Sequence, residues 1–303
     1  MLPKFPIPAS QGSNWTRSLI SLLAYIAIGL FIFPNYKVLL ILVLIVLLHE
    51  AGHLLAMRAF KYKDTGIFFI PFVGGFASGT KREISQRESA IVIACGPLPG
   101  MLIGALLIMA GRYNETVSFG DISWTWTGML FLSLNALNLL PVYPLDGGQL
   151  LNRVFLDEEG LLSNVFIFIS ALVLAALAVY LKFYPLLLFP LMMLWRLRPD
   201  PVSKKMEARI EAAGIKTDLD YEDLPDADYW KLREILIDLH PAFAGSSKSA
   251  DLYDEKEERI QAAISSLLHR HLIQDLSLHA KIMMGTLWAL ALVMTVKLLF
   301  LER

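Results

Sequence analysis

The stretch of sequence that decides the fold runs from Val38 to Phe60 and reads VLLILVLIVLLHEAGHLLAMRAF. It has the length, about 20 residues, that an α-helix needs to cross the hydrocarbon core of a bilayer. From Val38 to Leu48 every position is apolar, whereas a helix on the surface of a soluble protein is apolar on one face only. The stretch is therefore predicted to be a membrane-spanning helix.

The composition extends this prediction to the whole chain. Of the 303 residues 55% are hydrophobic and 18% are charged, whereas soluble domains usually carry about 25% charged residues. We predict an integral, multi-pass, all-α membrane protein with six to seven transmembrane segments. Two prolines in the short sixth segment argue against a full crossing there. The apolar segments are expected at roughly 18–34, 37–60, 89–111, 125–145, 161–181, 184–196 and 281–301.

Three further features limit what the chain does. A net charge of −1 gives no electrostatic reason to expect a nucleic acid partner. The single cysteine, Cys95, cannot form an intrachain disulfide, so no redox compartment follows. The first apolar segment lacks a small-residue cleavage site, and we therefore expect a retained span rather than a cleaved signal peptide.

Basic residues predict how the segments are oriented. Lysine and arginine are frequent in the loop 61–88, whereas the loop 112–124 holds Arg112 beside two acidic residues. An excess of lysine and arginine marks the cytoplasmic side of a membrane protein. The loop 61–88 is therefore expected in the cytoplasm, and following the chain from there places the N-terminal residues and 197–280 in the cytoplasm as well.

The polar part of the chain after the sixth segment predicts a separate domain. Residues 199–280 are acidic overall, and their apolar spacing predicts helices at about 201–213, 226–239 and 251–272. We predict a small cytoplasmic helical domain here. The chain is thus expected to comprise a transmembrane core (1–198), this domain (199–280) and a C-terminal transmembrane segment (281–303).

Three ionisable residues, His49, Glu50 and His53, interrupt the apolar stretch. Such groups are costly inside a membrane unless they are paired, so they are functional candidates. His49 and His53 are four residues apart and lie on one helix face, where both imidazoles can reach one zinc ion. Glu50 is placed to act on a water molecule at that ion. The alternative, a chance H-E-x-x-H, is disfavoured because apolar spans avoid these residues.

A third zinc ligand is expected, because catalytic zinc sites usually have three protein ligands and one open position. The candidate is Asp146, within NLLPVYPLDGGQLL at residues 138–151. The predicted topology brings it to the same depth as the two histidines. The alternative is a turn residue before two glycines. The remaining histidines are expected to have surface or packing roles; they are His240, His269, His271 and His279.

Two of these sequences together resemble a known family. HEAGH at 49–53 and NLLPVYPLDGG at 138–148 occur in this order, about a hundred residues apart and in apolar segments. This pattern is similar to that of the site-2 protease family of intramembrane metalloproteases. The resemblance covers about residues 37–155.

The resemblance implies roles for five residues. One zinc ion per chain would be held by His49, His53 and Asp146, and Glu50 would activate the water at the zinc ion. Asn138, which begins the second motif, would hold the scissile carbonyl or stabilise the oxyanion. The alternative for Asn138 is an interhelical hydrogen bond.

The third segment departs from the family pattern. The family often has a glycine-proline motif that is followed by an asparagine, whereas this chain reads GPLPG at 96–100 without the asparagine. A substrate-binding role for this segment is therefore not implied. Gly96, Gly100 and Gly104 instead have the spacing that allows close helix packing.

The apolar loop GIFFIPFVGGF at 66–76 resembles the membrane-associated strand or re-entrant loop of the family. It is too short to span a membrane, and irregular backbone at membrane depth must be buried in protein or line a cavity. A strand edge there can pair with an extended substrate. An ordinary interfacial hairpin is the alternative.

The expected function is hydrolysis of a peptide bond in or near a transmembrane segment of a membrane-anchored protein, in the cytoplasmic half of the bilayer. Three other functions stay open. A membrane protease of the other H-E-x-x-H class would need a glutamate ligand in an E-x-x-x-D pattern, which is not evident. A zinc-binding scaffold or regulator without proteolysis would not need Glu50. A metal or proton transporter usually has internal repeats, which we do not find.

Overall fold

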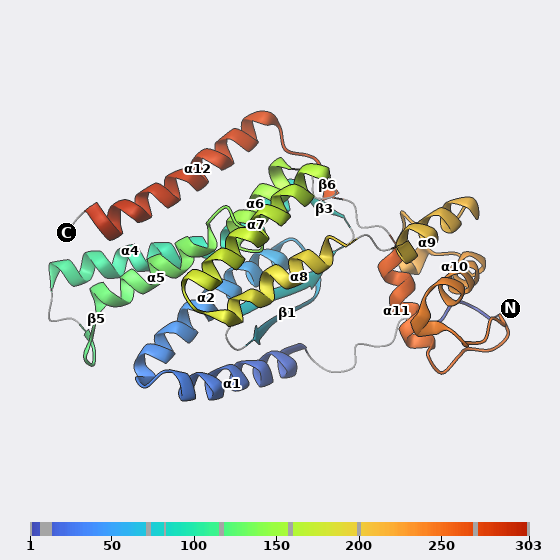
Figure 1. Ribbon diagram of the computed structural model, residues 1–303, viewed down its shortest axis with the longest axis horizontal. Coiled ribbons are helices and arrows are strands. Elements are labelled where there is room, and N and C mark those ends of the chain that lie inside the picture. Colours follow the sequence, from blue (N-terminus) through green and yellow to red (C-terminus); the bar gives the residue numbers. More distant parts are fainter. Residues whose placement is uncertain are drawn as a thin grey trace. The chain divides into compact units, whose positions relative to one another are not determined.

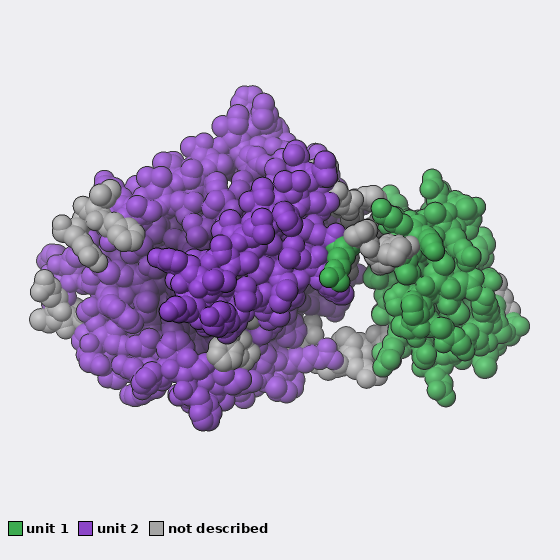
Figure 2. Space-filling model, viewed as in Figure 1, with its two compact units in different colours: residues 1–12, 198–271 green, residues 13–197, 272–303 purple. Residues whose placement is uncertain are grey.

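The chain folds into two compact units, which are coloured separately in Figure 2. The helical unit, as we call it, contains Met1–Gly12 and Arg198–His271. The second, here called the membrane unit, contains Ser13–Leu197 and Leu272–Arg303. The structure is a computed structural model. It describes residues 2–6, 14–70, 74–81, 83–114, 118–156, 160–198, 201–268 and 272–301.

Long apolar helices build the membrane unit (Figure 1). In the described residues, five helical stretches are long and apolar enough to cross a membrane. The prediction of a mainly helical, multi-pass membrane protein is thereby confirmed. The five stretches comprise α1 (Asn14–Ile32), α2 (Tyr36–Ala59), α3 (Gln86–Cys95) with α4 (Pro97–Tyr113), α7 (Leu161–Tyr180), and α12 (Leu278–Val296) with the π-helical turn η4 (Lys297–Leu301).

Two predicted segments are not single helices of membrane length. The fourth divides into α5 (Trp124–Asn138) and α6 (Asp146–Phe155). The loop between them holds two prolines, which lack the N–H group that a continuous helix needs. The sixth consists of the 3-10 turn η1 (Tyr184–Leu187) followed by α8 (Leu188–Arg196).

The apolar loop after α2 forms a β-hairpin. Strand β1 (Lys63–Ile70) pairs antiparallel with β2 (Gly74–Thr80), and Ile67 lies opposite Ala77. Helix α1 packs along β1, where the Phe69 N–H donates to Ser21 Oγ at 3.1 Å. The described strands form two further short pairs: β3 (Ile84–Ser85) lies parallel to β6 (Leu272–Ile273), and β4 (Ser118–Phe119) pairs with β5 (Ile122–Ser123) between α4 and α5.

Glycines allow α4 and α5 to pack at close range. A Cβ atom on Gly104 would lie 2.9 Å from the carbonyl oxygen of Gly128, and one on Gly128 would lie 2.6 Å from that of Gly104. Larger residues would therefore push the two backbones apart. The prediction that the glycine row of the third segment supports close packing is confirmed for Gly104, and this packing fixes which face of α5 points inward.

In its described residues, the helical unit consists of three short helices around one apolar core. They are α9 (Pro201–Ala212), α10 (Asp226–Leu239) and α11 (Glu257–Leu267), with the 3-10 turns η2 (Tyr221–Asp223) and η3 (Pro241–Phe243). The first two agree closely with the predicted helices. The third begins later than predicted because Asp254 Oδ1 accepts the Lys256 N–H (2.9 Å) and holds a turn there. Residues Leu2–Phe5, which the prediction assigned to 1–198, pack against this core.

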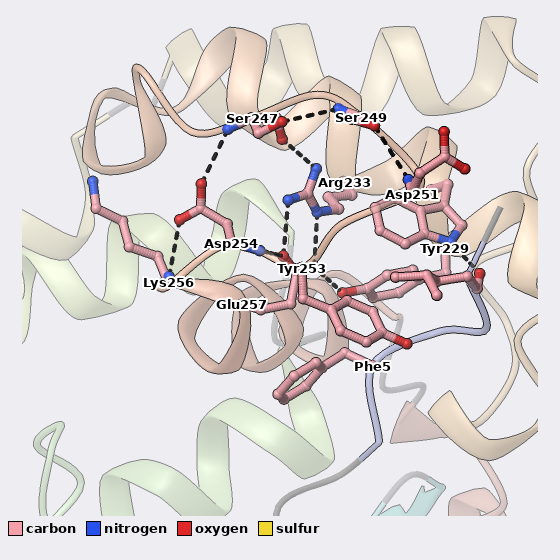
Figure 3. A network of polar contacts seen from close by, with 12 residues as sticks. Phe5, Tyr229, Arg233, Ser247, Ser249, Asp251, Tyr253, Asp254, Lys256 and Glu257 are labelled. Atoms are coloured by element: carbon pink, nitrogen blue, oxygen red, sulfur yellow. Dashed lines mark hydrogen bonds and ion pairs between the residues drawn. The ribbon is translucent and has the colours of Figure 1, made fainter.

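A buried ion pair links α10 and α11 (Figure 3). Arg233 and Glu257 are both 1% exposed. Arg233 Nε and Nη2 donate to the two carboxylate oxygens of Glu257 at 2.7 and 2.8 Å, and the Tyr229 hydroxyl donates to Oε1 at 2.5 Å. Burial alone would raise the pKa of Glu257, but these hydrogen bonds outweigh it and hold the pKa below its ordinary value. Glu257 therefore stays ionised and paired.

We expect Glu257→Ala to lower the opening free energy of α10 and α11 by roughly 3–5 kcal/mol, because it leaves the Arg233 guanidinium buried without its partner. Amide hydrogen exchange of these helices in the full chain measures this change. The neighbouring Glu258→Ala is the matched control, since Glu258 is exposed. Equal exchange in the two variants would show that the ion pair does not hold the helices together.

Candidate metal centre

Helix α2 presents two histidines to the interior of the membrane unit. His49 and His53 are one helical turn apart and are 6% and 8% exposed. Their Nε2 atoms lie 3.1 Å from each other. The structure thus brings the two rings together as the four-residue spacing predicts.

Asp146 reaches the same point from α6. Its Oδ2 atom lies 3.0 Å from His49 Nε2 and 3.4 Å from His53 Nε2. Asp146 is the first residue of α6, and the glycines that follow let this helix start close to the proline loop. A Cβ atom on Gly147 or Gly148 would overlap the backbone of that loop. The aspartate of this aspartate-glycine-glycine sequence supplies the carboxylate, and the two glycines allow the close packing that brings it to the histidines.

Hydrogen bonds at the far side of each ring indicate the histidine tautomers. His49 Nδ1 lies 2.9 Å from Asn135 Oδ1, and His53 Nδ1 lies 2.8 Å from the carbonyl oxygen of Val92. Both partners are acceptors, so each Nδ1 carries the proton and donates it. Each Nε2 atom is then left with a lone pair that points toward Asp146. Such outer partners commonly orient histidines that bind metals.

The three atoms that converge here fit a zinc ion. Two Nε2 lone pairs and a carboxylate oxygen are all acceptors, and they lie within 4.8 Å of one another. Asp146 Oδ2 is buried, and in the described part of the chain no hydrogen bond reaches it. Tetrahedral zinc ligands at about 2.0–2.1 Å are roughly 3.3 Å apart, which is close to the observed separations. A cation bound between these three atoms would remove the electrostatic repulsion among them.

Glu50 lies beside the two histidines and is 6% exposed. Its carboxylate lies close to the backbone of Ala77 on β2. A Cβ atom on Gly75 would lie 2.6 Å from Glu50 Cγ, so this strand can approach only because residue 75 is glycine. The β-hairpin thus covers the side of α2 that carries Glu50.

Asn135, which the sequence analysis did not single out, contacts a histidine of the centre. Asn135 is 1% exposed, accepts from His49, and donates its Nδ2 to the Phe131 carbonyl at 2.8 Å. Asn138 is half-buried one turn further along α5. The signal for Asn135 was present in the sequence, since it is a polar residue inside an apolar segment. Gly100 makes room for its amide, because a Cβ atom there would overlap it.

Glycines on α2 and at the start of α4 bring the third segment close to the histidines. A Cβ atom on Gly52 would overlap the Cys95 carbonyl, and one on Gly96 would overlap the His53 ring. This close approach allows the Val92 carbonyl on α3 to accept from His53. The third segment therefore supports the metal centre.

Comparisons with known proteins agree with this geometry. The sequence profile of peptidase family M50 matches residues 37–122. A zinc metalloprotease of Methanocaldococcus jannaschii is 32% identical over 143 residues, which are 46% of this chain and 41% of that protein. Stage IV sporulation protein FB of Bacillus subtilis is 33% identical over 121 residues, or 40% of this chain and 41% of that protein.

The region similar to peptidase family M50, residues 37–122, contains His49, Glu50 and His53, and Asp146 follows the matched residues. The chain matches about two fifths of the length of each of the two relatives. A solved structure of the site-2 protease from Methanocaldococcus jannaschii matches with a TM-score of 0.44 and 24% identity, over 59% of this chain and 86% of that one.

We expect the purified protein to contain about one zinc ion per chain, and Asp146→Ala to lose it, because the two imidazoles alone leave the site one protein ligand short. Elemental analysis of the detergent-solubilised protein measures the zinc content. Asp223→Ala, at an exposed position of the helical unit, is the control. Zinc retained at full occupancy in Asp146→Ala would remove Asp146 from the ligand set.

Asn135→Ala should weaken zinc binding by roughly 10–100-fold, because His49 loses the partner that fixes its tautomer and ring orientation. Asn138→Ala is the matched control and should bind zinc as the unchanged protein does. Competition with a chelator of known affinity measures both. The opposite order of effects would mean that Asn138, and not Asn135, orients the histidine.

Proposed function

We propose that this chain is an intramembrane zinc metalloprotease that hydrolyses a peptide bond in or near a transmembrane segment of a membrane-anchored protein. One observation carries the proposal: His49, His53 and Asp146 converge beside Glu50, in a unit built of helices of membrane length. A binding site for a structural metal would have no use for an unliganded carboxylate at this position. The M50 match supports the same activity.

The proposed reaction uses Glu50 as general base and then as general acid. A zinc ion held by the two histidines and Asp146 would supply Lewis acidity and lower the pKa of water at the site. Glu50 takes a proton from the attacking water and passes it to the nitrogen of the leaving amine. Burial in the membrane unit excludes bulk water and strengthens these electrostatic interactions.

Strand β2 offers a place for an extended substrate. Helix α1 packs against β1. In the described residues the sheet contains β1 and β2 alone, so the edge of β2 that faces away from β1 has no strand paired with it. Gly75 and Ala77 of β2 lie close to Glu50, which supports a substrate path along this strand beside the proposed catalytic carboxylate. A substrate that unwinds locally and pairs with β2 would bring its backbone carbonyls close to Glu50.

Asn138 remains the proposed partner of the scissile carbonyl. Asn135 is engaged at both ends of its amide, by His49 and by the Phe131 carbonyl. Asn138 is half-buried on the same helix, and its amide can donate to a developing oxyanion.

We further propose that the chain crosses the bilayer seven times. α5 and α6 together form the fourth crossing. The last turn of α6 lies beside the first turn of α3, where Arg153 donates to Ser89 (3.0 Å), so α6 ends on the side of the membrane on which α3 begins. Leu2–Phe5 and the residues 201–268 belong to one compact unit, so an even number of crossings separates them. Counting η1 with α8 as the sixth crossing meets this condition, and α12 is then the seventh.

Basic residues support a metal centre in the cytoplasmic half of the bilayer. Arg58, Lys61 and Lys63 follow His53 within ten residues. Positive charge of this kind marks the cytoplasmic end of a membrane helix. The centre would then lie a short distance inside that surface, and the helical unit would be cytoplasmic.

We expect Glu50→Gln to retain zinc and to lower cleavage of a transmembrane model substrate by about 10²–10⁴-fold, because the amide cannot accept the proton of the attacking water. A reconstituted assay with a single-pass substrate measures the rate. The exposed Glu83→Gln is the control and should cleave normally. Full activity in Glu50→Gln would rule out the assigned base, and transport of metal by an unchanged protein that cleaves nothing would favour a transporter.

A further inference from the structure

The N-terminal segment, Leu2–Phe5, packs against the helical unit. It forms neither a helix nor a strand, and Leu2 and Phe5 pack against the unit's apolar core. The surface that contacts the segment, here called the peptide groove, comprises residues of the turn η2, the start of α10 and the loop before α11. It is formed by Tyr221, Glu222, Leu224, Asp226, Trp230, Ala250 and Tyr253.

Aromatic side chains of the peptide groove bind the backbone of the segment. Trp230 Nε1 donates to the Leu2 carbonyl, Tyr253 Oη to the Pro3 carbonyl and Tyr221 Oη to the Phe5 carbonyl, each at 2.7 Å. At the other end, the Leu2 N–H donates to the Ala250 carbonyl at 2.8 Å. Aromatic donors that hold the carbonyls of an extended, proline-containing chain are typical of peptide-recognition grooves.

Three backbone carbonyls surround the ammonium group of Lys4. Nζ donates to the carbonyls of Tyr221, Glu222 and Leu224 at 2.9, 2.6 and 2.7 Å. These three acceptors use all three hydrogens of the group. Nζ also lies 5.7 Å from the centre of the Tyr221 ring, and the Lys4 N–H donates to Asp226 Oδ1 at 2.9 Å. These contacts favour a lysine at this position.

Two of the aromatic groups that hold the segment, Tyr221 and Trp230, belong to the core of the helical unit, and Tyr253 packs against that core. Trp230 and Tyr221 are buried, and Trp230 stacks on Tyr253 with ring centres 6.0 Å apart. Tyr253 also meets Phe5 edge-on at 5.2 Å, and both are drawn in Figure 3. Burial raises the pKa of Tyr221, so its hydroxyl stays protonated and donates. Side chains fixed in this way form a groove that needs little rearrangement on binding.

We propose that the helical unit is a peptide-recognition module whose groove binds an extended apolar–Pro–Lys–aromatic segment, and that Leu2–Phe5 is its resident, exchangeable occupant. A competing peptide of the same chemistry would displace the segment. The proposal does not depend on the proteolytic function.

The test is binding of a fluorescent peptide with the sequence of residues 2–8, LPKFPIP, to the full chain. A variant that lacks residues 2–6 should bind the probe saturably. The intact protein should bind it at least about tenfold more weakly, because a tethered segment competes at an effective concentration near the millimolar range. A probe with Lys4→Met should lose about tenfold or more in affinity, since it lacks the charged hydrogen bonds.

Point variants of the full chain give a test that does not depend on whether the deletion variant folds. Lys4→Met in the full chain weakens only the resident segment, so it should bind the unchanged probe more tightly than the intact protein does. Lys231→Met is the matched control, since Lys231 is an exposed lysine of α10 that pairs with Asp228. The proposal is overturned if Lys4→Met binds the probe no better than Lys231→Met. It is equally overturned if a deletion variant with protected α10 amides fails to bind it.

Discussion

The structure of the membrane unit depends on three acceptor atoms that face one another in an apolar interior. Two imidazole nitrogens and one carboxylate oxygen cannot share so small a space without a positive charge between them, and the hydrogen bonds of Asn135 and Val92 fix the histidines in the tautomer that keeps them acceptors. A zinc ion satisfies all three. The arrangement of α2, α3, α5 and α6 follows from the need to bring these groups to one point.

Small residues make that convergence possible. Gly52 and Gly96 let α2 and the third segment approach until a backbone carbonyl reaches His53, and Gly147 lets α6 begin against the proline loop. Gly75 likewise allows β2 to lie close to Glu50. Without a hydrophobic driving force between helices in lipid, association depends on such close packing. The glycines around the centre therefore matter for the proposed chemistry, because each sets the position of a candidate ligand, of its hydrogen-bond partner or of the Glu50 carboxylate.

The helical unit follows different physical rules. A buried bidentate ion pair between Arg233 and Glu257 links two of its helices. A short extended segment from the N-terminal part of the chain packs against the same unit. The side chains that donate to the carbonyls of that segment are Trp230 and Tyr221 of the core and Tyr253, which packs against it. A unit that holds a peptide in this manner has the properties of a binding module, whereas a simple packing domain would need only apolar contact.

The sequence by itself determined the local features. Hydropathy and length predicted the membrane helices, and the four-residue spacing placed His49 and His53 on one face, because helix geometry depends only on neighbouring residues. Asp146 was predicted from its motif and depth, and it meets the histidines. Only the tertiary structure decided that Asn135 rather than Asn138 meets His49, since the rotation of α5 is set by its glycine contact with α4. It alone also brought Leu2–Phe5 to Tyr221 and Trp230, because no local pattern encodes a contact across more than two hundred residues.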